Sequence, residues 1–281
     1  MSDTKIPRSI LITGCSSGIG LDAAQTLARE GWRVLATCRQ QSDVARLQAD
    51  GLESFRLDLA DPQSTADGAA EALDRTRNRL FAVYNNGAFA LPGAAEDLPR
   101  AALRETFETN VLGQFDLTNR LIPAMKTNGG GRIVMNSSVL GFCVMPFRGA
   151  YAASKYALEA LTDAMRLENR GTNLHVSLIE PGPIPSQIRV NSRAHFRRWI
   201  DPNRSFHCSA YQEKLIPALF DQDNTPSPFN RPPSAATDAL RRALTDLRPK
   251  ARYFVTPAPW GIWALRRMLN TRAMDYILSK G

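Results

Sequence analysis

Short apolar runs along the chain alternate with longer stretches in which apolar residues recur at helical spacing. The runs are a few residues long and are bounded by polar or glycine-containing turns, which predicts buried strands. The first six cover residues 9–13, 33–37, 53–57, 80–84, 132–136 and 174–179. The longer stretches predict helices over residues 19–30, 62–77, 100–126 and 150–170. Because each link between successive strands is long enough to hold a helix, the sheet is expected to be parallel.

Residues that favour helix ends lie where these boundaries need them. Asp61 precedes Pro62 as an N-cap, and Gly31 and Gly129 follow predicted helices as C-terminal stops. Pro123 is the exception, because a proline inside the helix predicted for residues 100–126 is expected to kink it.

The pattern changes after Glu180, where three prolines fall within five residues. Residues 187–233 are polar and punctuated by prolines, and only one helix, over residues 210–220, is predicted there. This segment is interpreted as a variable substrate-binding insertion or lid.

Regular structure returns in the last part of the chain. A helix is predicted over residues 235–247 and a seventh strand over residues 252–255. Residues 257–281 form an apolar and basic tail. The whole chain, residues 1–281, is therefore predicted to form one α/β domain.

Composition and charge narrow the classes of function. The 281 residues are 43% hydrophobic and 22% charged, which is typical of a globular protein. The net charge of +8 resides in residues 187–281, where 16 Lys and Arg face 7 Asp and Glu. These basic residues are scattered and match no nucleic-acid motif, so a nucleic-acid partner is not expected.

Targeting, membrane and metal signals are weak. The N-terminus is polar, and nowhere do about 18 apolar residues run together, so neither secretion nor a membrane span is expected. Four widely spaced cysteines predict free thiols and a cytoplasmic location, and His175 and His207 are interpreted as structural. No metal site is predicted. The cysteines are Cys15, Cys38, Cys143 and Cys208.

A glycine-rich turn follows the first predicted strand. The sequence Thr-Gly-Cys-Ser-Ser-Gly-Ile-Gly, residues 13–20, opens directly into a predicted helix, which is the context of a dinucleotide-binding turn. The glycines permit a tight turn, close approach of the pyrophosphate and packing of helix on strand, while the first amides of the helix face the phosphates. A purely structural turn is the alternative. The predicted cofactor-binding residues are Gly14, Ser16, Ser17, Gly18, Ile19 and Gly20.

The end of the second predicted strand indicates which dinucleotide binds. Proteins that bind NAD place an acid there to accept from the 2′-hydroxyl of the adenosine ribose. This chain has Cys38 instead, followed by Arg39, whose guanidinium is suited to a 2′-phosphate. The prediction is NADP(H), and the alternative is that Arg39 is a solvated surface residue.

Tyr151 and Lys155 lie four residues apart in a predicted helix and so share one face. A nearby cation favours the phenolate and brings a tyrosine, whose free pKa is about 10, closer to use in proton transfer. Ser138 follows the fifth strand, at the edge where ligands bind in parallel sheets, and its hydroxyl is suited to a carbonyl oxygen. Taken alone, the tyrosine and lysine pair would be ordinary helix packing.

Together these motifs resemble the short-chain dehydrogenase/reductase family over residues 9–186. The family pattern is T-G-x-x-x-G-x-G, N-N-A-G, S and Y-x-x-x-K in this order, and this chain matches it with Asn-Asn-Gly-Ala at residues 85–88. The resemblance implies a Rossmann fold, a doubly wound sheet of seven parallel strands in the order 3-2-1-4-5-6-7. It also implies a homodimer or homotetramer.

The resemblance assigns roles to individual residues. Tyr151 resembles the catalytic acid/base, Lys155 the residue that lowers its pKa and holds the nicotinamide ribose, and Ser138 the ligand of the substrate oxygen. Asn110 resembles the support of a proton-relay water. The remaining cofactor contacts that it implies are Asp58, Leu59, Asn86, Pro181, Gly182, Ile184 and Ser186, beside Tyr151 and Lys155 themselves.

Two departures from the family pattern stand out. Gly87 and Ala88 exchange the usual order of alanine and glycine, which puts only the local backbone in doubt. Ser186 stands where a threonine is common, and it keeps the hydroxyl.

The implied reaction is hydride transfer between NADP(H) and a carbonyl compound or its alcohol. A non-catalytic NADP-binding sensor or scaffold is the alternative, although such a protein would normally have lost the tyrosine or the lysine. A nucleotide-sugar epimerase of the longer-chain branch shares Y-x-x-x-K, but its glycine spacing is usually T-G-x-x-G-x-x-G.

The substrate is predicted to be lipophilic. Phe142 and Met145 follow Ser138 and predict an apolar pocket around Ser138 and Tyr151. The tail, with Trp260 and Trp263 before two arginines, is similar to that of members acting on retinoids, hydroxysteroids and lipophilic aldehydes, and predicts peripheral membrane contact. The alternative is that these aromatic residues close the core or a subunit interface.

Overall fold

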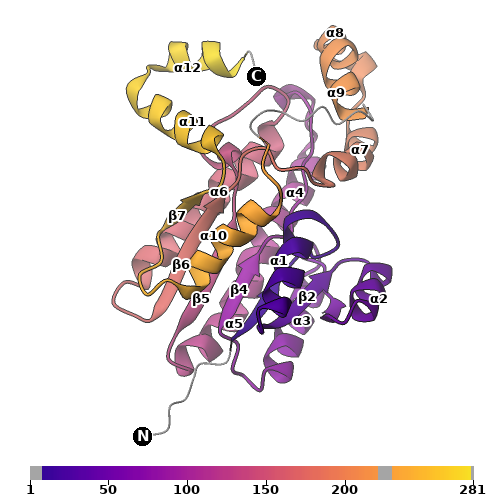
Figure 1. Ribbon diagram of the computed structural model, residues 1–281. Helices are drawn as coiled ribbons and strands as arrows, with labels where there is room; N and C mark the ends of the chain where they lie inside the picture. Colours follow the sequence, from indigo (N-terminus) through magenta and orange to yellow (C-terminus); the bar gives the residue numbers. More distant parts are fainter. Residues whose placement is uncertain (1–7, 221–229, 280–281) are drawn as a thin grey trace, which may run out of the picture.

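The structure is a computed structural model that describes residues 8–220 and 230–279. Its centre is one parallel sheet in the order β3-β2-β1-β4-β5-β6-β7 (Figure 1). The predicted fold class, strand order and seven strands are confirmed. The strands are β1 (Ser9–Ile12), β2 (Arg33–Cys38), β3 (Glu53–Arg56), β4 (Ala82–Asn85), β5 (Gly131–Asn136), β6 (Leu174–Glu180) and β7 (Arg252–Phe254).

Helices cover both faces of the sheet because alternate strand residues point to opposite sides. Ile10 and Ile12 of β1 pack with helices α1, α2 and α10, whereas Leu11 between them packs with α3, α5 and α6. Each face of the sheet therefore carries an apolar cluster, as expected for a parallel sheet covered by helices on both sides. The helices are α1 (Gly18–Arg29), α2 (Gln41–Ala49) and α10 (Ser234–Thr245) on one face, and α3 (Pro62–Arg75), α5 (Gly113–Thr127) and α6 (Gly149–Glu168) on the other.

The predicted helix boundaries are confirmed. The carboxylate of Asp61 accepts from the amide of Gln63 at 2.9 Å and so caps α3. Gly31 and Gly129 lie just beyond α1 and α5 with φ of +81° and +91°, a conformation that favours glycine.

The helix predicted over residues 100–126 is interrupted, but not at Pro123. It divides into α4 (Arg100–Phe107), a π-helical turn η2 (Glu108–Leu112) and α5, which runs through Pro123 to Thr127. The interruption falls at Asn110, whose buried side chain bonds to a neighbouring loop. Single π turns are frequent at functional sites.

The prediction of only one helix within residues 187–233 was wrong. Helix α7 (Ile188–Trp199) precedes the predicted one, which forms as α8 (Cys208–Ala210), η5 (Tyr211–Leu215) and α9 (Ile216–Phe220). In α7 only Ser192 and Phe196 are buried, so the apolar periodicity that reveals a helix is missing. Residues 221–229 of this segment lie outside the described residues.

These helices lie beyond the carboxyl ends of the strands, at the same end of the molecule as the C-terminal helices (Figure 1). The segment has its own apolar cluster, formed by Phe196, Ile200, Tyr211, Leu215 and Leu219 with Ala94. The tail forms α11 (Pro257–Met268) and α12 (Thr271–Leu278), and residues 280–281 lie outside the described residues. The remaining short 3₁₀ turns are η1 (Ala95–Asp97), η3 (Val139–Gly141) and η4 (Pro202–Arg204).

Two further observations bear on the sequence predictions. All four cysteines are free thiols, as predicted. Within residues 8–220 and 230–279, no helix combines the length and apolar character needed to cross a membrane.

Candidate active site

The predicted site residues gather at the carboxyl edge of the sheet. The glycine-rich turn follows β1, Asn86 follows β4, Ser138 follows β5 and Pro181 follows β6. Because the strands are parallel and adjacent, their carboxyl ends open into one crevice, the usual ligand site of such sheets.

The glycine-rich turn has the backbone conformation and the close packing that require glycine. Gly14 and Gly18 have φ of +71° and +58°, and a Cβ on Gly14 would lie 2.7 Å from the Cα of Gly87. The side chain of Ser17, at the N-cap of α1, makes no capping hydrogen bond, so the first amides of the helix remain available to phosphate. The unpaired first amides of α1, beside glycines that lack a Cβ, therefore fit a pyrophosphate.

Asn86 and Thr13 hold this turn in place. Asn86 donates through Nδ2 to the carbonyls of Thr13 (3.0 Å) and Gly14 (3.1 Å) and accepts from Asn136 at 2.9 Å. The hydroxyl of Thr13 accepts from the amides of Asn86 and Gly87 at 3.0 and 2.9 Å. Thr13 was not predicted as a site residue, although its place directly before Gly14 was a usable signal. Gly87, which stands where the family usually has alanine, belongs to this network through its amide, which donates to Thr13.

Three arginines, Arg39, Arg46 and Arg56, lie near the end of β2, where Arg46 pairs with Asp43 and Arg56 lies 4.0 Å from Asp58. Arg39 is exposed just after β2, its carbonyl accepts from Arg56 at 3.2 Å, and Arg46 of α2 donates to the carbonyl of Ser16 at 2.7 Å. Cys38 is buried and offers no acid to a ribose. Arg46 was missed because α2 itself was not predicted.

Asp58 and Leu59 follow β3 beside this end. The carboxylate of Asp58 accepts from the amide of Ala60 at 3.1 Å and lies 4.0 Å from Arg56, while Leu59 is buried. Both residues lie just beyond the carboxyl end of β3.

The structure brings Ser138, Tyr151 and Lys155 together. Tyr151 and Lys155 lie on α6, and the hydroxyls of Ser138 and Tyr151 share a hydrogen bond. The ammonium of Lys155 lies 5.6 Å from the centre of the Tyr151 ring and donates to the carbonyl of Asn136 at 2.7 Å. A hydroxyl pair with a cation beneath it can hold and protonate a carbonyl oxygen.

Burial dominates the ionisation of this group. It raises the pKa of Tyr151 to about 12, although the hydrogen bond with Ser138 opposes the rise. Burial also lowers the pKa of Lys155 to about 8. The predicted lowering of the Tyr151 pKa by Lys155 is not found, because burial dominates and the opposing contribution comes from Ser138. At neutral pH Tyr151 keeps its proton and can act as a donor.

Asn110 lies in the π turn and its side chain is fully committed. Its Oδ1 accepts from the amide of Phe89 at 3.0 Å, and its Nδ2 donates to the carbonyl of Phe89 at 2.9 Å and to Ser154 at 3.0 Å. Ser154 directly precedes Lys155, so Asn110 connects the loop after β4 to helix α6.

The loop after β6 runs from Pro181 to Ser186 towards the glycine-rich turn. The carbonyl of Pro181 accepts from the amide of Val139 at 2.9 Å, next to Ser138. A Cβ on Gly18 would lie 3.3 Å from the Cβ of Ser186, so the loop reaches the phosphate cradle. Gly182 and Ile184 lie between these contacts and are partly buried.

Sequence profiles then identify the family. The profile for short chain dehydrogenases matches residues 8–196. The chain belongs to the short chain dehydrogenase family. The uncharacterized oxidoreductase YbbO of Escherichia coli strain K12 is 42% identical over 96% of this chain and 94% of its own. Human 17-beta-hydroxysteroid dehydrogenase type 1 is 35% identical over 88% of this chain and 77% of its own.

Solved structures of this family share the fold. One from Burkholderia phymatum, in complex with NAD, has a TM-score of 0.78 at 22% identity, covering 95% of each chain. Another from Burkholderia cenocepacia, in complex with NADP, has a TM-score of 0.71 at 20% identity, covering 97% of each chain. The chain is thus an oxidoreductase of a fold that carries either nicotinamide dinucleotide.

In this dehydrogenase the substrate loop, the turn of residues 142–148 that was predicted to border the substrate, contacts the C-terminal tail of residues 257–279. The ring of Phe142 packs against Phe254 at 5.8 Å, and its carbonyl accepts from Arg266 of α11. Trp260 and Trp263 pack on the same Phe254 at 5.3 and 6.1 Å. Phe142 therefore lies at the contact with α11. Met145 is partly buried, and its carbonyl accepts from the amide of Arg148 at 3.1 Å.

His195 on α7 was overlooked in the sequence. Its Nδ1 lies 3.1 Å from Glu105 of α4, and its ring stacks on Phe89 at 4.0 Å. His195 thus joins α7 to the loop after β4. Asn110 holds the same loop through its hydrogen bonds with the backbone of Phe89. Because α7 was not predicted, no pattern drew attention to this histidine.

Proposed function

We propose that this protein is an NADPH-dependent reductase of lipophilic aldehydes or ketones, with Tyr151 as the acid. The observation that carries the proposal is the hydrogen-bonded pair of Ser138 and Tyr151 above the buried ammonium of Lys155, beside a turn suited to a dinucleotide. A sensor of the same fold has no need for this arrangement.

The proposed mechanism assigns a task to each side chain. When bound, the nicotinamide cofactor supplies the hydride that reduces the carbonyl carbon. The hydroxyls of Ser138 and Tyr151 hold the carbonyl oxygen, and Tyr151 gives it a proton. Lys155 stabilises the phenolate that remains, because its positive charge lies close to the ring. In the reverse oxidation Tyr151 acts as the base.

NADP(H) is preferred over NAD(H) in this proposal because no acid occupies the end of β2 and three arginines surround it. Replacing Arg39 with aspartate is expected to raise the KM for NADPH at least about tenfold, since a charged hydrogen bond contributes about 1.5 kcal/mol or more. The KM for NADH should fall, because the new carboxylate can accept from a 2′-hydroxyl. Steady-state kinetics with both cofactors measures the exchange.

The control for this change is Arg170→Asp, which alters the same charge at an exposed residue just after α6. It should leave both KM values within about twofold. An unchanged preference in the Arg39 variant would assign the 2′-phosphate to another group.

The proposed lipophilic substrate matches the apolar contacts of the substrate loop and the printed names of relatives, which include retinol and hydroxysteroid dehydrogenases. We further propose that α11 and α12 rest on an anionic membrane surface, which would bring such substrates near the site. Trp260, Met268, Tyr276 and Ile277 are exposed large apolar or aromatic residues on these helices. Arg267 and Arg272 lie among them and are exposed.

The membrane proposal predicts that the protein sediments with vesicles containing phosphatidylserine at low salt. High salt or a Trp260→Ser change should reduce the bound fraction severalfold, because each removes one source of attraction. Vesicles of phosphatidylcholine alone are the control. Failure to bind anionic vesicles at low salt would remove the proposal.

The reductase proposal is tested by following NADPH consumption with a panel of aliphatic, aromatic, retinoid and steroid carbonyl compounds. Turnover of a lipophilic member with NADPH favoured over NADH is the expected result. Tight NADPH binding without turnover across the whole panel would support the sensor instead.

A further inference from the structure

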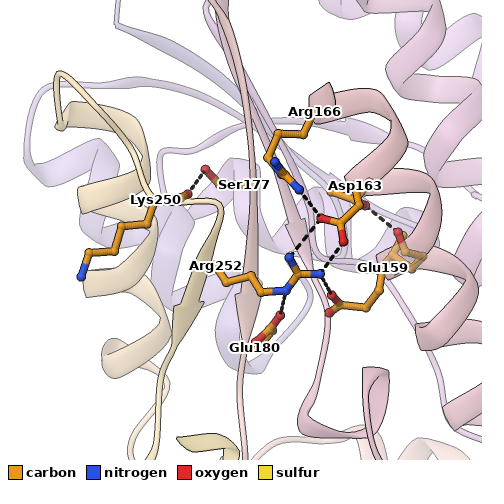
Figure 2. A network of polar contacts seen from close by, with 9 residues as sticks. Glu159, Asp163, Arg166, Ser177, Glu180, Lys250 and Arg252 are labelled. Carbon is orange, nitrogen blue, oxygen red and sulfur yellow. Dashed lines mark hydrogen bonds and ion pairs between the residues drawn. The ribbon is translucent and has the colours of Figure 1, made fainter. Parts of the chain in front are cut away.

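A cluster of charged side chains lies beside the catalytic helix, between α6, β6 and β7 (Figure 2). Arg252 of β7 contacts three carboxylates: Glu159 at 2.9 Å, Asp163 at 2.7 Å and Glu180 at 3.0 Å. Arg166 lies on the far side, 2.9 Å from Asp163. Glu180 is fully buried and Glu159 is only 7% exposed. Neither glutamate belongs to the site described above.

The two buried glutamates share a hydrogen bond. Burial, together with the neighbouring Glu159, raises the pKa of Glu180 to about 9. At neutral pH Glu180 is therefore protonated. Burial also raises the pKa of Glu159, but its contact with Arg252 at 2.9 Å opposes the rise and favours the charged form of Glu159.

Glu159 reaches the catalytic groups from this position. It lies one helical turn beyond Lys155 on α6, and its charge opposes the effect of burial on the pKa of Lys155. A Cβ on Gly141 would lie 3.0 Å from its Oε1 and 2.5 Å from the hydroxyl of Ser137, so Glu159 also packs beneath the turn that carries Ser138.

We propose that Glu159 is a positioning residue for the reaction: fixed by Arg252 and Glu180, it keeps the buried ammonium of Lys155 charged and in place beneath Tyr151. Lys155 is 1% exposed and donates to a neutral carbonyl, so its charge needs a nearby counter-charge. Glu159 supplies this counter-charge, while the ammonium of Lys155 stays bonded to the carbonyl of Asn136. The catalytic relevance of this arrangement rests on the proposed function.

The charged and titratable groups around Glu159 are few in the described chain. They are Lys155, Asp163 and Arg166 on α6, Glu180 on β6 and Arg252 on β7, with Tyr151 beyond Lys155. Asp163 provides a matched comparison. It binds Arg252 through two hydrogen bonds, at 3.0 and 2.7 Å, but lies two turns from Lys155.

The test is the titration of Lys155 by NMR in protein carrying ¹³C at the lysine ε-carbon, with Lys155→Arg to assign the signal. In Glu159→Gln the pKa of Lys155 is expected to fall by about one unit. In Asp163→Asn it should stay within about 0.3 units. An unchanged lysine in Glu159→Gln, or equal shifts in both variants, would overturn the proposal in favour of a purely structural cluster.

Arg252→Lys is a second variant, for use if Glu159→Gln does not fold. A single ammonium lacks the planar fork that engages three carboxylates, so Glu159 is held less firmly and its charged form is less stabilised, and the pKa of Lys155 is expected to fall. A lysine pKa that stays unchanged in Arg252→Lys contradicts the proposal.

The titration needs neither cofactor nor substrate, so it separates this inference from the proposed function. If the protein reduces carbonyl compounds, the loss of kcat at high pH should move to lower pH in Glu159→Gln by the same amount as the lysine, with little change in the KM for NADPH. A shifted lysine in a protein that reduces nothing would support the positioning role and reject the reductase.

Discussion

Replacing Tyr151 with phenylalanine is expected to lower the kcat of carbonyl reduction by about 10²- to 10⁴-fold, the usual contribution of a positioned proton donor. The change removes one oxygen from a ring held on α6, so the fold and the cofactor crevice remain. The carbonyl oxygen would still meet Ser138, but it would have to take its proton from water. Single-turnover kinetics with saturating NADPH measures the chemical step directly.

Tyr156→Phe is the matched control. Tyr156 lies five residues further along α6, and its hydroxyl accepts from Arg266 at 2.9 Å, outside the crevice. This variant should keep kcat within about threefold of the parent. NADPH binding, followed by fluorescence, should be unchanged in the Tyr151 variant. If that variant retained more than about a tenth of the parental kcat, another group would have to be the acid.

The cofactor half of the site could be predicted from the sequence because its parts are local. The glycine-rich turn needs only glycines at fixed spacing between a strand and a helix, and the backbone performs most of the work. The seven strands were equally visible, since their apolar runs are buried on both faces. Arg46 was not predicted because its role depends on a bond to Ser16 that no spacing rule describes, whereas Thr13 stood in the glycine-rich motif without being assigned a role.

The substrate half could not be predicted to the same depth. Helix α7 buries so little apolar surface that its sequence is typical of a loop. Because this helix was not predicted, His195 and its contact with Glu105 were not predicted either. The contact of Phe142 with Phe254 joins residues more than a hundred positions apart. Long-range contacts of this kind arise from the folded topology, which a pattern in one stretch of sequence does not record.

The cluster around Arg252 shows the same limit. Glu159, Glu180 and Arg252 come from three elements, and only the pairing of β7 with β6 brings them together. In the sequence Glu180 was only the last residue before a proline-rich loop. The pKa of Glu180 is raised to about 9 because its carboxyl is buried. That burial is determined by the fold and could not be predicted from the sequence.

Replacing Arg252 with methionine is expected to lower the free energy of unfolding by about 3 kcal/mol at neutral pH, because it strands buried carboxylates without a partner. Glu159 and Glu180 are buried, and the loss falls at the lower end of the range for such pairs since Arg252 and Asp163 are each about a third exposed. Arg33→Met is the control. Arg33 binds Glu53 through two hydrogen bonds of 2.9 Å, but its side chain is 49% exposed, so the cost should stay below about 1 kcal/mol.

The pH dependence of this loss separates electrostatics from packing. Burial already raises the pKa values of Glu159 and Glu180 in the parent, and the loss of Arg252 should raise them further, so the folded variant binds more protons than the folded parent. The deficit relative to the parent is therefore largest at high pH and shrinks as the pH falls. Denaturant unfolding at several pH values measures it. A deficit that does not vary with pH would mean that Arg252 stabilises the fold through the packing of its aliphatic part, and that Glu159 does not depend on its charge.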